Sequence, residues 1–223
     1  RLAKLASLIA PLGPETPVYA ASQAVMDAVV GFPIHRGVLA HGLRPAGAEA
    51  ATLLDNLPPR ALVVVLFGVA NHDNMGGVFR NAAAFGADAV LIDAGCCDPF
   101  YRKAIRVSVG AALRVPFARL GEGEDALALL EGRGFEPLAL SPGAEAPLSD
   151  APRFARAAVL LGAEGPGLPP SLLARARTVS IPMAAGWDSL NLAAASAVVL
   201  HELTKPRRPL GIPLTTAGGE MAG

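Results

Sequence analysis

The sequence predicts an α/β fold built on a mostly parallel sheet. The apolar, β-branched run ALVVVLF at residues 61–67 shows no alternation, which is typical of a strand buried on both faces. Short runs of this kind alternate with helical segments, and this order favours parallel strands joined by helical crossovers. The 223 residues are 52% apolar, so the chain can bury a sizeable core in one or two domains.

The elements are placed from apolar periodicity and from turn residues. Strands are expected at 18–20, 61–67, 87–93, 114–118, 135–141, 157–161 and 178–181. Helices are expected at 1–13, 22–30, 75–85, within 98–120, at 122–133, from Pro169 onward and after Asn191. Ser22, Asn74 and Ser189 are the expected N-caps, and Gly86 is the expected residue just past the end of its helix.

Two prolines mark a domain boundary. Pro58 and Pro59 exclude a continuing helix, so residues 46–60 are expected to form an extended linker between a domain at 1–45 and a larger one at 61–207. Residues 208–223 lack apolar periodicity and are expected to form a flexible tail. The chain begins at Arg1 without a methionine, inside a predicted helix, so we expect residues upstream.

The bulk properties exclude several classes of protein. The apolar runs are far shorter than the roughly 20 residues of a membrane helix, and no secretion signal opens the chain, so a cytoplasmic location is the default. The adjacent Cys96 and Cys97 suit neither an ordinary disulfide nor a metal site, and we expect no metal. A net charge of zero argues against a protein that coats nucleic acid, but not against an RNA enzyme.

Four side chains are candidate functional groups, each with a plainer alternative. Arg80 interrupts a helix of small and apolar residues, Glu164 lies in a glycine-rich turn after a strand, and Ser189 and Asn191 begin the last helix. The alternatives are a surface arginine, an ordinary turn carboxylate and helix caps. Gly76 and Gly77 each cost the helix about 1 kcal/mol relative to alanine, so something must approach that helix closely.

Two loops are candidate binding sites. The turn at 141–143 follows a strand, at the edge of a parallel sheet where ligands bind, and is therefore a candidate cofactor loop. Residues 35–44 contain His35, Arg36 and Arg44, which suit contact with RNA but equally suit a solvated strand. The sequence contains no phosphate-binding P-loop and no dinucleotide fingerprint, so we expect neither ATP nor a dinucleotide as a ligand.

Three stretches carry a family resemblance in their order and spacing. They are NHDNMGGVFRNAAAFGADAVLI at 71–92, LLGAEGPGL at 160–168 and IPMAAGWDSLN at 181–191. Together they resemble the three motifs of the SpoU/TrmH family of RNA ribose 2′-O-methyltransferases, within the SPOUT superfamily. Each motif alone is weak, because glycine-rich turns are common, but three in order are specific.

The resemblance implies a fold and an activity. The fold is a SPOUT-type α/β domain with a C-terminal trefoil knot, preceded by a partial, small α+β domain that binds the RNA substrate. The activity is methyl transfer from S-adenosylmethionine to a ribose 2′-hydroxyl of structured RNA, ribosomal or transfer, by a homodimer. A catalytically silent RNA-binding relative and a base methyltransferase of the same superfamily remain alternatives.

The resemblance also assigns roles to residues. The catalytic residues would be Asn74, Arg80, Glu164, Ser189 and Asn191. The cofactor would be held by Leu140, Ser141, Gly162, Ile181, Met183 and Leu190. The RNA would contact His35, Arg36, Arg44 and Arg102. Because an arginine is almost never deprotonated, we expect Arg80 to orient the hydroxyl or a phosphate and to stabilise negative charge, not to act as a base.

Overall fold

The structure is a computed structural model that describes residues 2–34, 38–187 and 189–205. The chain divides into two compact units, Arg1–Pro45 and Ala46–Gly223. Among the described residues, no helix has the length and apolar character needed to cross a membrane.

The first unit contains two short helices, α1 (Leu2–Ile9) and α2 (Gln23–Val30). Ser22 caps α2 as predicted, because its hydroxyl accepts a hydrogen bond from the backbone N–H of Val25 at 3.4 Å. The strand expected at 18–20 does not form, since Val18 and Tyr19 are exposed and pair with no other strand. The described residues of this first unit thus form helices and no strand.

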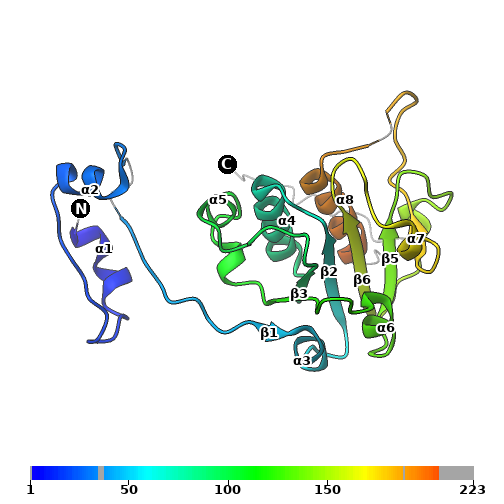
Figure 1. The fold of residues 1–223 in the computed structure, drawn as a ribbon, viewed down its shortest axis with the longest axis horizontal. Helices are drawn as coiled ribbons and strands as arrows, with labels where there is room; N and C mark the ends of the chain where they lie inside the picture. Colours follow the sequence, from blue (N-terminus) through cyan, green and yellow to red (C-terminus); the bar gives the residue numbers. More distant parts are fainter. Residues whose placement is uncertain (1, 35–37, 188, 206–223) are drawn as a thin grey trace, which may run out of the picture. The chain divides into compact units, whose positions relative to one another are not determined.

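The second unit is organised around a seven-stranded sheet in which every pairing is parallel (Figure 1). The strand order is β1-β4-β3-β2-β6-β5-β7. The strands are β1 (Ala48–Glu49), β2 (Ala61–Phe67), β3 (Ala89–Ile92), β4 (Phe117–Arg119), β5 (Glu136–Leu140), β6 (Arg156–Gly162) and β7 (Arg177–Val179). The predicted fold class is confirmed, and the prediction for β2 matches its bounds.

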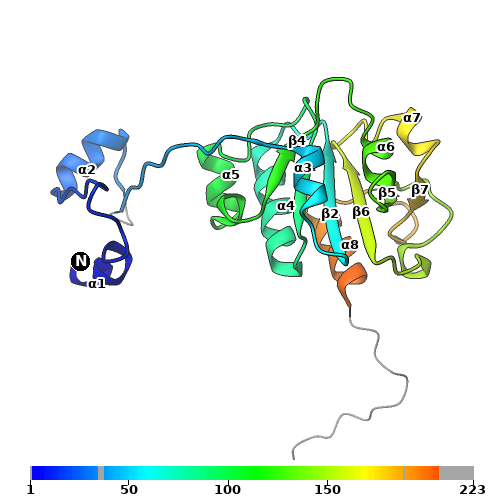
Figure 2. The same cartoon turned by 90° about the horizontal axis from the view of Figure 1, so that it is seen from below.

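Helices cover both faces of this sheet (Figure 2). They are α3 (Ala50–Asp55), α4 (His72–Phe85), α5 (Arg102–Val107), α6 (Ala126–Glu131), α7 (Pro170–Leu173) and α8 (Leu192–Thr204), with 3₁₀ turns η1 (Ala111–Leu113) and η2 (Leu148–Asp150). Alternate residues of β2 serve the two faces. Val64 and Leu66 pack in the core with α4, α5 and α8, whereas Val63 and Val65 pack with α3, α6 and α7.

The residues expected to form a linker, 46–60, are instead part of the folded unit. Strand β1 pairs with β4, and Leu54 of α3 is fully buried. The guanidinium of Arg156 fixes the end of α3, because it donates to the carbonyl oxygens of Leu54 at 3.1 Å and Pro58 at 2.8 Å. The two prolines therefore end a helix and lead directly into β2.

The central pairing of β2 with β6 determines where a site can form. Its register runs from Ala61 opposite Arg156 to Phe67 opposite Gly162, so both strands end at the same edge. Strand β5 pairs along β6, and β7 pairs along β5, in the same direction. Loops that follow these strands therefore meet at one edge, where parallel sheets bind ligands.

Candidate active site

A pocket of about 570 Å³ lies beside the carboxyl ends of β5, β6 and β7. This volume falls within the roughly 300–1,000 Å³ that is common for small-molecule sites. Its walls are the ends of β5 and β6, the turn at 163–167, the loop between β7 and α8, and the first residues of α8. All six residues expected to hold the cofactor line it: Leu140, Ser141, Gly162, Ile181, Met183 and Leu190.

Gly162 holds one wall of the pocket in place by close backbone packing. A Cβ atom at Gly162 would lie 2.1 Å from the carbonyl carbon of Gly167 and 2.4 Å from the backbone nitrogen of Leu168. The turn also closes on itself through a hydrogen bond of 3.0 Å from the N–H of Gly167 to the carbonyl of Ala163. Only glycine at 162 allows the turn to fold back against the end of β6.

One side chain, Asn191, joins the three sequence motifs at the mouth of this pocket. Its Nδ2 donates to Oδ1 of Asn74 at 2.9 Å and to Oε1 of Glu164 at 2.9 Å. Its Oδ1 accepts from the backbone N–H groups of Ala193 at 2.9 Å and Ala194 at 3.3 Å. Asn191 is therefore the N-cap of α8, and the expectation that Ser189 caps this helix was wrong.

Asn74 also differs from its predicted role. Helix α4 begins at His72 and is capped by Asn71, whose Oδ1 accepts from the backbone N–H groups of Asp73 and Asn74. Asn74 is thus inside the first turn, 5% exposed, and its side chain turns to Asn191. Because its Oδ1 accepts from Asn191, the Asn74 amide presents its NH₂ group as a donor elsewhere.

The glycine pair of α4 serves contacts between helices. A Cβ atom at Gly76 would lie 2.7 Å from the carbonyl oxygen of Ala104, in α5, and one at Gly77 would lie 2.5 Å from Cβ of Ala193, in α8. Something does approach the helix closely at both glycines, as expected, and it is the neighbouring helices α5 and α8 that fill the space.

Arg80 lies outside the pocket of its own chain. It is exposed, it does not line the pocket, and it makes no hydrogen bond or ion pair with any other described residue. One turn beyond Gly76 and Gly77, it extends from the side of α4 that faces away from the sheet.

The remaining predicted residues are spread over both units. Ser189 is exposed and lines the pocket, whereas Arg102 begins α5 and is exposed outside the pocket. Arg44 is exposed in the first unit, and His35 and Arg36 lie outside the described residues. Within the second unit, the structure thus gathers Glu164, Asn191 and Asn74 with Ser189, whereas Arg102 lies apart from them.

Sequence reasoning missed two polar features of the same region. Asn81 donates from Nδ2 to the carbonyl of Ala193 at 2.7 Å and to the fully buried hydroxyl of Ser196 at 2.8 Å, which ties α4 to α8. The rings of His72 and Tyr101 are in contact at the start of α4, with a centroid distance of 4.3 Å and an interplanar angle of 43°. The only indication in the sequence of the bonds between α4 and α8 is an asparagine, Asn81, within the apolar helix.

The cysteines have no part in the pocket. The Sγ of buried Cys96 donates to the carbonyl of Leu66 at 3.4 Å and accepts from the N–H of Val69 at 3.3 Å. Burial raises the pKa of the Cys96 thiol to about 12, and burial also raises the pKa of Cys97. Among the described residues, no three His, Cys, Asp or Glu side chains are grouped to hold a metal ion.

Comparison with known proteins places this architecture in a family. The model of the SpoU rRNA methylase family matches residues 61–201. An uncharacterized tRNA/rRNA methyltransferase of Mycobacterium bovis is 42% identical over 216 residues, which cover 95% of this chain and 73% of that protein. The family match includes strands β2 to β7 and the residues that line the pocket.

Solved structures agree with this assignment. The crystal structure of an RNA 2′-O ribose methyltransferase matches with a TM-score of 0.60 at 34% identity, over 66% of this chain and 56% of that chain. An AdoMet-bound rRNA methyltransferase from Sinorhizobium meliloti matches with a TM-score of 0.64 at 27% identity, over 71% of this chain and 60% of that chain. This chain thus spans less than two thirds of either. It belongs to the SpoU family of S-adenosylmethionine-dependent RNA methyltransferases.

Proposed function

We propose that the protein transfers the methyl group of S-adenosylmethionine to a ribose 2′-hydroxyl of ribosomal or transfer RNA. The observation that carries this proposal is the hydrogen-bonded set Glu164–Asn191–Asn74 at the mouth of the pocket. Each member comes from a different motif of the family. A structural cap at the start of α8 would need only the Oδ1 of Asn191, not the two bonds from its Nδ2.

The pocket suits S-adenosylmethionine in shape and chemistry. Leu140, Ile181, Met183 and Leu190 give it apolar walls that fit an adenine ring, and Glu164 gives it a carboxylate that fits a positively charged ligand. The backbone of the 163–167 turn contributes further polar groups. When bound, this cofactor supplies an electrophilic methyl group on a positively charged sulfur.

The side chains at the mouth would position the ribose. Asn191 fixes the Asn74 amide so that its NH₂ group can donate to the 2′-oxygen, which directs a lone pair of that oxygen toward the methyl group. Glu164 in turn fixes Asn191 through its Oε1. The new O–C bond forms as the C–S bond breaks, and the hydroxyl proton passes to an RNA phosphate or to water.

Arg80 requires a second copy of the chain in this scheme. It extends from the outer side of α4, and we propose a homodimer in which this side brings Arg80 to the partner's pocket. There it would stabilise the charge that develops during transfer. Mixing Arg80→Ala protein with Asn191→Ala protein tests this arrangement, because a mixed dimer would contain one intact site. Recovery of activity on mixing supports the shared site, and no recovery contradicts it.

The knot is a further part of the proposal. Strand β7 lies at one edge of the sheet, while α8 returns to pack on α4. We propose that the chain between them passes through the loops at 141–147 and 163–167. Tracing the backbone of residues 140–205 in a crystal structure decides this point.

Calorimetry with S-adenosylmethionine and its demethylated product tests the cofactor assignment. We expect saturable binding of both ligands by the wild-type protein and weaker binding by Gly162→Ala. If folded protein gave no heat and no thermal shift with either ligand at millimolar concentration, the catalytic proposal would be wrong. If the cofactor bound but RNA gained methyl groups only on its bases, the alternative of a base methyltransferase would replace it.

A further inference from the structure

The single tryptophan of the chain is placed where burial does not explain it. Trp187 lies in the loop between β7 and α8 and is 76% exposed. Among the described residues, its side chain makes no hydrogen bond and no ring contact, and its backbone N–H donates to the carbonyl of Ala184 at 3.2 Å. Tryptophan is usually highly buried, and its ring contributes a large apolar contact area to cores and interfaces. An indole ring that is exposed to solvent in this way can provide apolar contact area to a binding partner.

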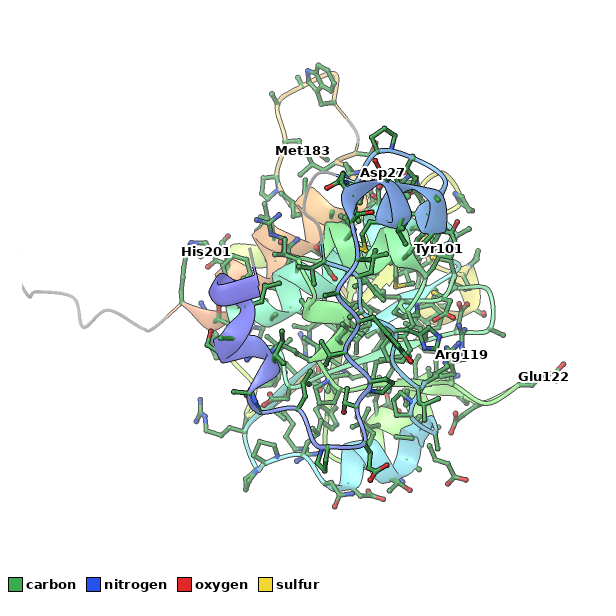
Figure 3. All side chains as sticks on the ribbon, turned by 90° about the vertical axis from the view of Figure 1, so that its left-hand side faces the viewer. Asp27, Tyr101, Arg119, Glu122, Met183 and His201 are labelled. Carbon is green, nitrogen blue, oxygen red and sulfur yellow. The ribbon has the colours of Figure 1, made fainter. Side chains whose placement is uncertain are left out.

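The loop that carries Trp187 is anchored at both ends in the pocket wall. Ile181 and Met183 line the pocket before the tryptophan, and Ser189 and Leu190 line it afterwards. Figure 3 shows Met183 on this loop, which stands out from the body of the domain, as the orange loop in Figure 1 also does. Trp187 itself does not line the pocket. Its ring is thus available to a second substrate that reaches the mouth of the pocket from outside.

The composition of the loop limits which part of an RNA it can bind. Residues 182–187, PMAAGW, include no basic side chain, so this segment offers no charge to a phosphate. An indole ring can stack on any nucleobase, because every base has a π-face. In structured RNA, the bases that are free to stack on a protein are those of loops, bulges and ends.

We propose that Trp187 stacks on an unpaired nucleobase at or next to the nucleotide whose ribose is methylated. The substrate would then be an unpaired nucleotide in a loop or bulge, not one held inside a continuous duplex. This inference rests on the proposed function, since it takes RNA as the methyl acceptor. Trp187 is a positioning residue in this account, because it contacts neither the cofactor nor the reacting hydroxyl.

Two variants separate stacking from simple apolar contact. Trp187→Phe keeps an aromatic face, whereas Trp187→Leu keeps apolar bulk without one. Loss of one base–aromatic stack lowers affinity by roughly tenfold to a hundredfold. We therefore expect Trp187→Leu to raise the KM for RNA by about that factor, while kcat and the Kd of S-adenosylmethionine stay near the wild-type values. Trp187→Phe should recover most of the loss.

The dependence on salt adds a readout that a structural role would not give. Stacking releases no counterions, so the slope of log K against log salt should be the same for wild type and Trp187→Leu. Loss of a phosphate-binding arginine would instead reduce that slope by about one unit. Binding is measured by the anisotropy of a labelled oligoadenylate and of an abasic oligoribonucleotide of equal length. A preference for oligoadenylate that persists in Trp187→Leu would overturn the proposal.

The intrinsic fluorescence of the wild-type protein reports on the same residue, because the chain has no other tryptophan. Oligoadenylate should quench this fluorescence and the abasic oligomer should not. Equal quenching by both oligomers would contradict stacking. Emission that is shielded from iodide in the protein alone would show that the ring is already covered before RNA binds, which also overturns the proposal.

The outcome also separates this inference from the proposed function. If the wild-type protein methylates RNA and Trp187→Leu does so with unchanged KM, stacking is wrong and the methyltransferase proposal stands. If the wild-type protein neither binds S-adenosylmethionine nor methylates RNA, the proposed function fails, and the stacking proposal fails with it.

Discussion

Replacement of Asn191 by alanine removes two kinds of hydrogen bond at once. It removes the cap of α8, which is worth about 1 kcal/mol. It also removes the partner of the Asn74 amide, which is 5% exposed, and a buried polar group left without its partner costs about 1–3 kcal/mol. The sum is about 2–4 kcal/mol. For a domain of this size, we expect Tm to fall by roughly 4–16 °C.

A second variant separates the cap from the bridge. Asn191→Asp keeps an acceptor for the N–H groups of Ala193 and Ala194, but it places a carboxylate where Nδ2 now donates to Glu164 and Asn74. The two carboxylates repel each other, so this variant should also lose stability. Adding Glu164→Gln should restore much of that loss, because the glutamine NH₂ group can donate to the new carboxylate.

Stability and activity should then separate in the double variant. With a carboxylate at position 191, the Asn74 amide turns its NH₂ group inward and presents Oδ1 to the substrate. The pair Asn191→Asp with Glu164→Gln should therefore regain Tm without regaining methyl transfer. Thermal unfolding and transfer of labelled methyl groups to RNA measure the two quantities. An unchanged Tm in Asn191→Ala, or an active double variant, would refute the assigned hydrogen bonds.

Three other predictions follow from the same geometry. Gly162→Ala should weaken cofactor binding and lower Tm, because its Cβ would overlap the backbone of the 163–167 turn. The control Gly47→Ala, whose Cβ meets nothing within 4 Å and which does not line the pocket, should change neither. Arg80→Ala should lower turnover by about a hundredfold with little change in cofactor Kd, and Arg80→Lys should not fully restore the rate. A wild-type rate of Arg80→Ala at saturating RNA would mean that Arg80 is an ordinary surface residue. Unfolding restores the ordinary pKa of the Cys96 thiol near 9.0, so the unfolded state loses this proton first, and the free energy of unfolding measured in urea should fall as the pH rises from about 9 toward about 12. Cys96→Ala should lack this part of the decline, and an identical decline in the variant would contradict the assignment.

The central strands could be predicted because burial on both faces of the sheet is enough to explain their residue types. The run at 61–67 is apolar throughout, and strands buried on both faces require this pattern. Strand β1 was missed because it contains only Ala48 and Glu49, too few residues to show any period. Alanines around α3 and the prolines after it resemble a linker in sequence, and only the burial of Leu54 distinguishes the two.

The caps could not be assigned from the sequence because several suitable residues compete at each helix start. Asn71 and Asn74 both suit the cap of α4, and Ser189 and Asn191 both suit the cap of α8. The choice depends on what the other side chain does in the folded domain. Asn74 bonds to Asn191 over a separation of 117 residues, which no local pattern records.

The position of Arg80 relative to the pocket could not be predicted from the sequence for a different reason. Its place among small and apolar residues indicated a ligand-facing side, but the single chain leaves it outside the pocket. Helical spacing gives the direction of a side chain relative to its own helix and not the identity of the surface that covers it. The proposed partner copy would be a property of assembly, which the pattern of one chain does not reveal.

The central claim is tested most directly by the chemical form of the product. Purified protein is incubated with isotopically labelled S-adenosylmethionine and unmodified RNA, the RNA is digested to nucleosides, and the labelled nucleosides are identified by mass spectrometry. The account predicts a labelled 2′-O-methylnucleoside that is lost in Asn191→Ala. Label found only on a base, or no label in RNA from folded protein that binds the cofactor, would contradict it.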